Sequence, residues 1–210
     1  YAPTGICFGV DGLGVFVHED NPIDQLNLQQ IDAIFSSTRE RGYGEPITNW
    51  GQLVRLGDYI DATVQKFGRD ELSGTYGSFK DKALLGGSFA SDVTELPGSA
   101  AVIRKVAQDP FAIGYAGIAF RMRGVKALAL AEGPEGPYYS WGTARFFSTD
   151  HPLARRIYLY VNKPPAEPLD PALRAFLEFV LSAEGQEIVA NDGYAAIAAD
   201  VAAIERRKLD

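Results

Sequence analysis

Residues 67–76 combine an arginine, two short hydroxyl side chains and two glycines where a strand pattern gives way to a helix pattern. The first N–H groups of a helix have no intrahelical partner and carry partial positive charge, so an anion can approach them where a glycine leaves the backbone bare. Gly74 is such a glycine, and the hydroxyls of Ser73 and Thr75 add donors beside it. The planar guanidinium of Arg69 suits a tetrahedral oxyanion. This spacing indicates a site for a small oxyanion.

The same residues also allow a purely structural interpretation. Ser73 can cap the helix, because serine is a favoured N-cap residue with or without a ligand. Arg69 can pair with Asp70 or Glu71 at the surface, where ion pairs are common and weak. The segment alone therefore leaves both interpretations open.

Motifs for other chemistry are missing from the sequence. There is no phosphate-binding G-x-x-x-x-G-K-[ST] loop, no dinucleotide G-x-G-x-x-G motif, no H-E-x-x-H and no G-x-S-x-G. The two histidines, His18 and His151, have no partner at metal-ligand spacing, so we expect them to be structural or surface residues. Cys7 lies in an apolar run and is expected to be a small buried hydrophobe. We expect no enzyme activity, no cofactor and no bound metal.

Composition and charge make nucleic-acid binding and a membrane-spanning segment unexpected for this chain. The chain has 210 residues with 46% hydrophobic side chains, enough for a real core, and a net charge of −7. That acidic balance offers no basic field to hold nucleic acid. No stretch reaches the roughly 18 apolar residues of a membrane span. The chain opens at Tyr1 without a charged and then apolar leader, so we expect a mature, trimmed or truncated form.

Strand patterns alternate with helix patterns along the chain, which predicts an α/β fold with a mostly parallel or mixed sheet. Runs of β-branched and aromatic residues predict strands at 12–18, 112–118, 125–130 and 156–162. A further strand is expected to end at Gly68 and Arg69. Helices are predicted after an Asn27 cap, from near Ser73, after a Ser99 cap, from Asp170-Pro171 and over about 195–207. The polar segment 36–46 is expected to be a surface loop.

The order of these segments resembles the substrate-binding proteins of bacterial phosphate ABC transporters. The resemblance spans nearly the whole chain and is carried by short motifs at residues 11–17, 20–22, 34–36, 47–50, 97–99, 112–115, 156–163, 179–186 and 193–194, together with Arg69 and the Ser-Gly-Thr of 73–75. It implies a periplasmic-binding-protein-like II fold, in which two lobes of mixed sheet flanked by helices surround a cleft.

The resemblance also implies a division of the chain. Residues 1–20 would be a strand crossing between lobes, residues 21–155 the anion-binding second lobe, and residues 156–210 the return strand and C-terminal helices of the first lobe. The first lobe is expected to be incomplete, because the family's N-terminal half lobe would precede Tyr1. That half lobe carries the aspartate that accepts the proton of hydrogen phosphate.

The implied function is high-affinity capture of inorganic phosphate in the cleft and its delivery to an ABC transporter permease. The implied place is the periplasm or cell surface, with only peripheral contact with the membrane complex. Arg69, Ser73, Gly74 and Thr75 would contact the phosphate, and Glu71 is a possible orienting partner for Arg69. Sulfate, molybdate or tungstate as the ligand, and a sensing or interaction module of the same fold, remain alternatives.

Overall fold

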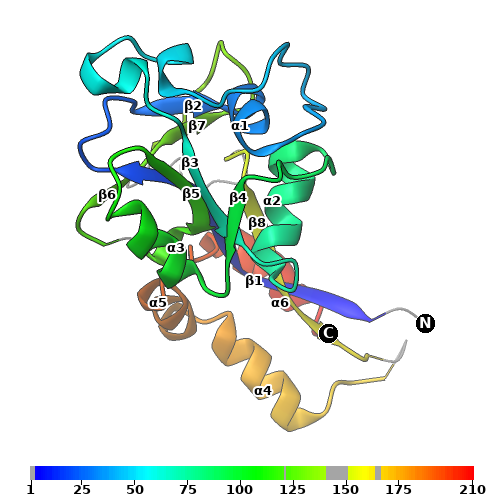
Figure 1. The fold of residues 1–210 in the computed structure, drawn as a ribbon. Helices are drawn as coiled ribbons and strands as arrows, with labels where there is room; N and C mark the ends of the chain where they lie inside the picture. Colours follow the sequence, from blue (N-terminus) through cyan, green and yellow to red (C-terminus); the bar gives the residue numbers. More distant parts are fainter. Residues whose placement is uncertain (1–2, 121, 141–150, 164–166) are drawn as a thin grey trace. The chain divides into compact units, whose positions relative to one another are not determined.

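The computed structural model describes residues 3–120, 122–140, 151–163 and 167–210 (Figure 1). The chain divides into two compact units: Gly12–Leu153, and Tyr1–Asp11 together with Ala154–Asp210. The long strand β1 (Thr4–His18) contributes its first half to the smaller unit and its second half to the larger one. The α/β class is confirmed. The division into lobes at 1–20, 21–155 and 156–210 stays a prediction.

The sheet of the larger unit has the strand order β4-β3-β5-β1-β6. Its strands are β3 (Gln65–Arg69), β4 (Val93–Leu96), β5 (Ala112–Gly117), the second half of β1, and β6 (Val125–Ala127). β3 runs parallel to both of its neighbours, while β1 is antiparallel to β5 and β6. The carboxyl ends of β4, β3 and β5 therefore meet at one edge of the sheet.

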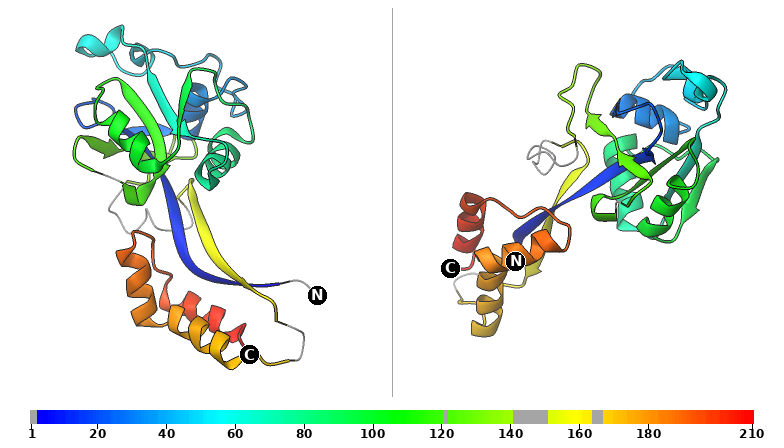
Figure 2. Two further views of the ribbon diagram at one scale, coloured as in Figure 1. Left: turned by 60° about the horizontal axis from the view of Figure 1, so that its bottom comes forward. Right: turned by 90° about the vertical axis from the view of Figure 1, so that its left-hand side faces the viewer.

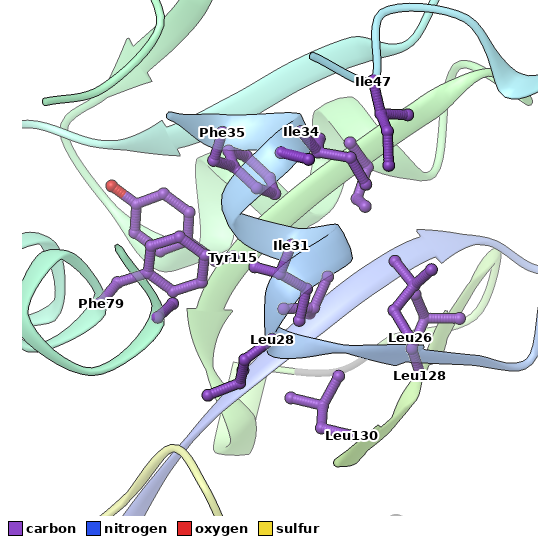
Figure 3. Packing of buried hydrophobic residues seen from close by; sticks show 14 of the residues in the cluster. Leu26, Leu28, Ile31, Ile34, Phe35, Ile47, Phe79, Tyr115, Leu128 and Leu130 are labelled. Carbon is purple, nitrogen blue, oxygen red and sulfur yellow. The ribbon is translucent and has the colours of Figure 1, made fainter. Parts of the chain in front are cut away.

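Helices cover both faces of this sheet. α1 (Leu28–Phe35) and α2 (Gly74–Leu84) pack on the face that carries Ile113 and Tyr115. α3 (Ser99–Val106) packs on the other face, against Ala112 and Ala116. Figure 3 shows the rings of Phe79 and Tyr115 lying one over the other, with centroids 3.9 Å apart and planes inclined by 7°. The main core thus lies between this face of the sheet and the helices α1 and α2.

The start of α1 follows the sequence closely. Asn27 caps the helix, and the side chain of Gln30 accepts from the Asn27 N–H in return, which makes a capping box. Three short 3₁₀ turns, η1 (Trp50–Gln52), η2 (Gly57–Ile60) and η3 (Ile118–Phe120), complete the loops of this unit.

Residues 125–130 are two short strands, not the single strand that was predicted. β6 pairs with β1, whereas β7 (Ala129–Ala131) pairs in parallel with β2 (Gln25–Asn27). The chain changes partner at Leu128, whose N–H donates to Val15 O, while the next N–H, that of Ala129, donates to Asp24 O. The sequence carried no signal for this change, because no glycine, proline or other turn residue separates the two short strands.

In the smaller unit, the first half of β1 pairs with β8 (Ala154–Val161). Its helices are α4 (Pro171–Val180), capped by Asp170 as predicted, α5 (Ala183–Asn191) and α6 (Ala199–Arg207), seen from two further directions in Figure 2. Its core consists of Ile6, Val161, Leu169, Leu177, Leu181 and Leu209. Cys7 is buried, as predicted, and its N–H donates to Glu205 Oε2 at 2.9 Å.

The last helix begins later than predicted. Ala195 exchanges two backbone hydrogen bonds with Val10, so the chain is still extended there and α6 starts at Ala199. Within the described residues, no helix combines the length and the apolar character that crossing a bilayer requires.

His151 is a buried histidine of the larger unit. Its side chain is 2% exposed, and its Nδ1 accepts from the Leu153 N–H at 3.2 Å. Burial, with a smaller contribution from Lys82, lowers the pKa of His151 to about 4 from an ordinary value of 6.5. The neutral ring is therefore the form that the fold accommodates.

We predict that the larger unit loses stability as the pH falls from 6.5 towards 4, because the unfolded chain takes up a proton that folded His151 resists. The loss should amount to roughly 3 kcal/mol at the lower end. His151→Asn should flatten this dependence, because asparagine keeps an acceptor for the Leu153 N–H and does not titrate. Urea unfolding followed by tryptophan fluorescence measures it, since Trp50 is buried in the core of this unit.

His18→Asn is the matched control, because His18 Nδ1 also accepts a backbone N–H at 3.2 Å, from Asp20. The pH dependence of the parent should persist in this variant. An equally steep acid loss in His151→Asn would contradict the assignment to His151.

Candidate anion-binding site

The predicted anion segment lies at the edge where the three parallel strands end. Arg69 is the last residue of β3 and is aligned with Leu96, the last residue of β4, while Gly117 ends β5 beside them. In open α/β sheets, ligands bind outside the carboxyl ends of the strands. The loops that follow three strands can therefore reach a common ligand here.

Ser73 caps α2 and closes the loop that leads to it. Its Oγ accepts from the N–H groups of Thr75 and Tyr76, both at 3.1 Å, and its own N–H donates to Asp70 O at 3.1 Å. Ser73 therefore caps α2, as the structural interpretation expects, and its Oγ uses its acceptor capacity for this cap. Because Oγ is the acceptor in both side-chain bonds, its hydroxyl proton remains to be donated.

Gly74 and Thr75 form the first turn of α2. Gly74 is the first helical residue and is exposed, and Thr75 is partly buried beside it. Within the described residues, Thr75 Oγ1 makes no hydrogen bond, so its hydroxyl is also open to a ligand. The amino end of α2 adds the partial positive charge of a helix N-terminus.

The guanidinium of Arg69 is held by residues that follow β4. Nη1 donates to Ser99 Oγ at 3.1 Å and Nη2 to Pro97 O at 3.3 Å. Nε is buried and has no hydrogen-bond partner among the described residues. Glu71 is exposed, and no ion pair or hydrogen bond joins it to Arg69 in the described part of the chain. Ser99 and Pro97 occupy the orienting place that was expected of Glu71.

The backbone of Arg69 rests on an aromatic support. The phenol of Tyr115 donates to Arg69 O at 3.4 Å, and its ring is stacked on Phe79. Burial raises the pKa of Tyr115 well above its ordinary value, so the phenol stays a donor. Gly68 lies against this ring: a Cβ at Gly68 would stand 2.6 Å from Tyr115 Cε1. This contact was not predicted from the sequence, although a lone glycine inside a strand indicates such a close approach.

The opposite end of α2 is anchored by Arg41, in the loop predicted at 36–46. Its Nε donates to Ala83 O at 2.7 Å, its Nη2 donates to Lys82 O, and its Nη1 pairs with Glu132 at 2.6 Å. The Arg41 N–H donates to the buried Asp32 Oδ2 at 2.7 Å. Burial raises the pKa of Asp32. The guanidinium thus binds carbonyls that the end of a helix leaves without partners.

The strand edge presents mainly hydrogen-bond donors. Arg69 supplies a permanent positive charge, Ser73 and Thr75 supply hydroxyl protons, and α2 supplies its amino end. Within the ranges that the structure describes, no group of three or more His, Cys, Asp or Glu residues could hold a metal ion. This chemistry suits a small oxyanion.

The chain is similar to known binding proteins. The family model described as "PBP superfamily domain" matches residues 4–184. The phosphate-binding protein PstS of Pseudomonas aeruginosa is 45% identical over 202 residues, which cover 96% of this chain. Among solved structures, an ABC-type phosphate transport receptor from Vibrio cholerae matches with a TM-score of 0.72 at 19% identity, over 93% of this chain and 73% of that one.

A second solved structure, PstS from Borrelia burgdorferi, matches with a TM-score of 0.68 at 22% identity, over 94% of this chain and 73% of that one. At these identities the two structures establish the fold. The chain spans 62% of the length of the Pseudomonas relative.

We predict that Gly68→Ala distorts the site, because the added methyl group collides with the Tyr115 ring. Overpacking of this kind destabilises a core by about 1–3 kcal/mol. The free energy of unfolding of the larger unit, followed by tryptophan fluorescence, measures the effect. Gly77→Ala in α2 is the matched control, since a Cβ there meets nothing within 4 Å. A glycine in a helix interior is less stable than alanine by roughly 0.5–1 kcal/mol, so the control should be neutral or more stable. Equal stabilities of the two variants would contradict the role of Gly68.

Proposed function

The chain belongs to the PBP superfamily, and from the donor set at its strand edge we propose that it captures inorganic phosphate for an ABC transporter. It would deliver phosphate to the transporter's permease from the periplasm or cell surface, and touch the membrane complex only peripherally. Phosphate would be bound and released unchanged, without catalysis. The named relatives support this reading, since a phosphate-binding protein and a phosphate transport receptor are among them.

The observation that carries the proposal is the pairing of a fixed guanidinium with a helix start. Arg69 ends β3, and four residues later Ser73 caps α2. The guanidinium and the hydroxyl donors therefore lie at the same edge of the sheet, where the parallel strands end. In this proposal Arg69, Ser73, Gly74 and Thr75 contact the phosphate oxygens. The unpartnered Nε of Arg69 is consistent with a guanidinium whose donors are kept for a ligand.

The donors of this edge are too few for tight binding by themselves. A hydrogen bond to a charged group contributes about 1.5–3 kcal/mol, and part of that sum is lost to ordering and desolvation. Micromolar affinity needs roughly 8 kcal/mol. We therefore propose that further ligands, beyond residues 69–75, complete the phosphate shell.

The net charge of −7 does not oppose this function. Charges on a protein surface are screened beyond about 8–10 Å at physiological ionic strength. Recognition at the edge would come from the nearby guanidinium, hydroxyls and helix amides. The summed charge of the chain has little influence at that range.

We predict that Arg69→Ala and Thr75→Ala in the full-length protein each weaken phosphate binding at least about tenfold without unfolding it, because each removes a direct donor. Isothermal titration calorimetry with inorganic phosphate measures the affinity, and the urea midpoint of each variant checks the fold. Arg55→Ala is the control, because Arg55 is an exposed arginine of the same unit outside the site. Unchanged affinity in both site variants would overturn the proposal.

Competition separates phosphate from its alternatives. The donor edge would accept any tetrahedral oxyanion, so sulfate, molybdate and tungstate are titrated against bound phosphate. Discrimination against sulfate needs an acceptor for the proton of hydrogen phosphate, since a site that bonds that proton leaves a polar group unpaired when sulfate binds. Tighter binding of one of the other oxyanions would reassign the ligand and leave the site residues unchanged.

A further inference from the structure

Ser99 stands at the start of a helix but does not cap it. The N-cap of α3 is Gly98, which makes no side-chain cap hydrogen bond, and Ser99 is the first helical residue. The prediction of Ser99 as the N-cap is therefore wrong. A side-chain cap typically stabilises a helix by about 1 kcal/mol, so α3 goes without this stabilisation although a serine is adjacent. The Ser99 hydroxyl forms hydrogen bonds with groups outside α3.

The partners of this hydroxyl come from two other strand ends. Ser99 Oγ lies 3.1 Å from Arg69 Nη1 at the end of β3 and 3.4 Å from the N–H of Gly117 at the end of β5. Ser99 begins α3, the helix that follows β4 in the chain, and is 4% exposed. One buried oxygen thus connects three parallel strands at the edge where the oxyanion would bind.

We propose that Ser99 is a positioning residue for Arg69, and this inference rests on the proposed function for its effect on phosphate. Arginine has many rotamers, and a side chain that becomes ordered only on binding weakens the complex. Ser99 Oγ accepts from one terminal nitrogen and Pro97 O from the other, so the plane of the fork is fixed before a ligand arrives. Ser99 does not itself contact the phosphate.

Two features distinguish positioning from simple support of the fold. The contacts to Arg69 leave Nε buried and unpaired, so they do not satisfy the guanidinium as a purely structural cluster would. The preference of serine for the N-cap position is also not followed at Ser99, since its hydroxyl bonds Arg69 and does not cap α3. Such conflicts between local preference and observed structure concentrate at functional sites.

A double-mutant cycle in the full-length protein tests the inference with inorganic phosphate as the probe. Ser99→Ala should weaken binding about tenfold when Arg69 is present, and less than about twofold when Arg69 is already alanine. Ser99→Thr, which keeps the hydroxyl, should restore affinity to within about threefold of the parent. Equal losses in the two backgrounds would show that Ser99 acts independently of Arg69 and would overturn the proposal.

Ser36→Ala is the matched control. Ser36 is 2% exposed, and its Oγ accepts from two N–H groups, those of Thr38 and Arg39, both at 3.1 Å. Ser36 Oγ also bonds the Thr38 hydroxyl at 3.1 Å, so Ser36→Ala removes a buried, hydrogen-bonded serine hydroxyl that has no contact with Arg69. Phosphate affinity should stay within about twofold of the parent in this variant.

A second measurement needs no phosphate. The ¹⁵Nε–¹H resonance of Arg69 reports the mobility of its side chain in the ligand-free protein. Ser99→Ala should make this group clearly more mobile, whereas Ser36→Ala should leave it unchanged. If the parent fails to bind phosphate, the proposed function falls, and this measurement still decides the role of Ser99. An Arg69 side chain equally rigid in parent and Ser99→Ala would overturn it.

Discussion

The parallel pairing of β3 with both β4 and β5 is the constraint from which the candidate site follows. Because the three strands run in the same direction, their carboxyl ends share one edge, and segments far apart in sequence are brought together there. Arg69, the Pro97–Ser99 turn and Gly117 are separated by up to 48 positions yet are joined by hydrogen bonds. An antiparallel neighbour would have put one of these ends at the opposite edge, and the guanidinium would have lost its supports.

Aromatic packing and polar contacts both hold the carboxyl end of β3 in place. The Tyr115 ring lies against Gly68 and stacks on Phe79, so the strand cannot shift without disturbing the main core. Ser99 and Pro97 then fix the terminal nitrogens of Arg69. Protein interiors are packed about as densely as organic crystals, so a side chain anchored to such a core keeps its geometry. These layers give the site its order before any ligand is present.

Much of the fold could be predicted from local signals. Asn27, Ser73 and Asp170 cap helices as their residue types indicate, and the apolar strand patterns place the sheet. The failures have a common cause, which is that the deciding partner is distant in sequence. The chain changes strand partner at Leu128 because the backbone there bonds residues more than a hundred positions earlier. Ala195 stays extended because it pairs with Val10. The candidate site was predicted as a segment, but the contacts of Arg69 were not, since Glu71 is the nearer partner in sequence and Ser99 is the one that it bonds in the structure.

The anchoring of α2 by Arg41 connects the polar loop of residues 36–46 to the helix of the candidate site. An aligned helix has a negative pole at its last carbonyls, and the Arg41 guanidinium, which also pairs with Glu132, donates hydrogen bonds to the Lys82 and Ala83 oxygens at that pole. The positive pole lies at Gly74, roughly 16 Å away by the rise of 1.5 Å per residue. The loop that bears Arg41 therefore restrains, from the far end, the helix whose first turn forms the candidate site.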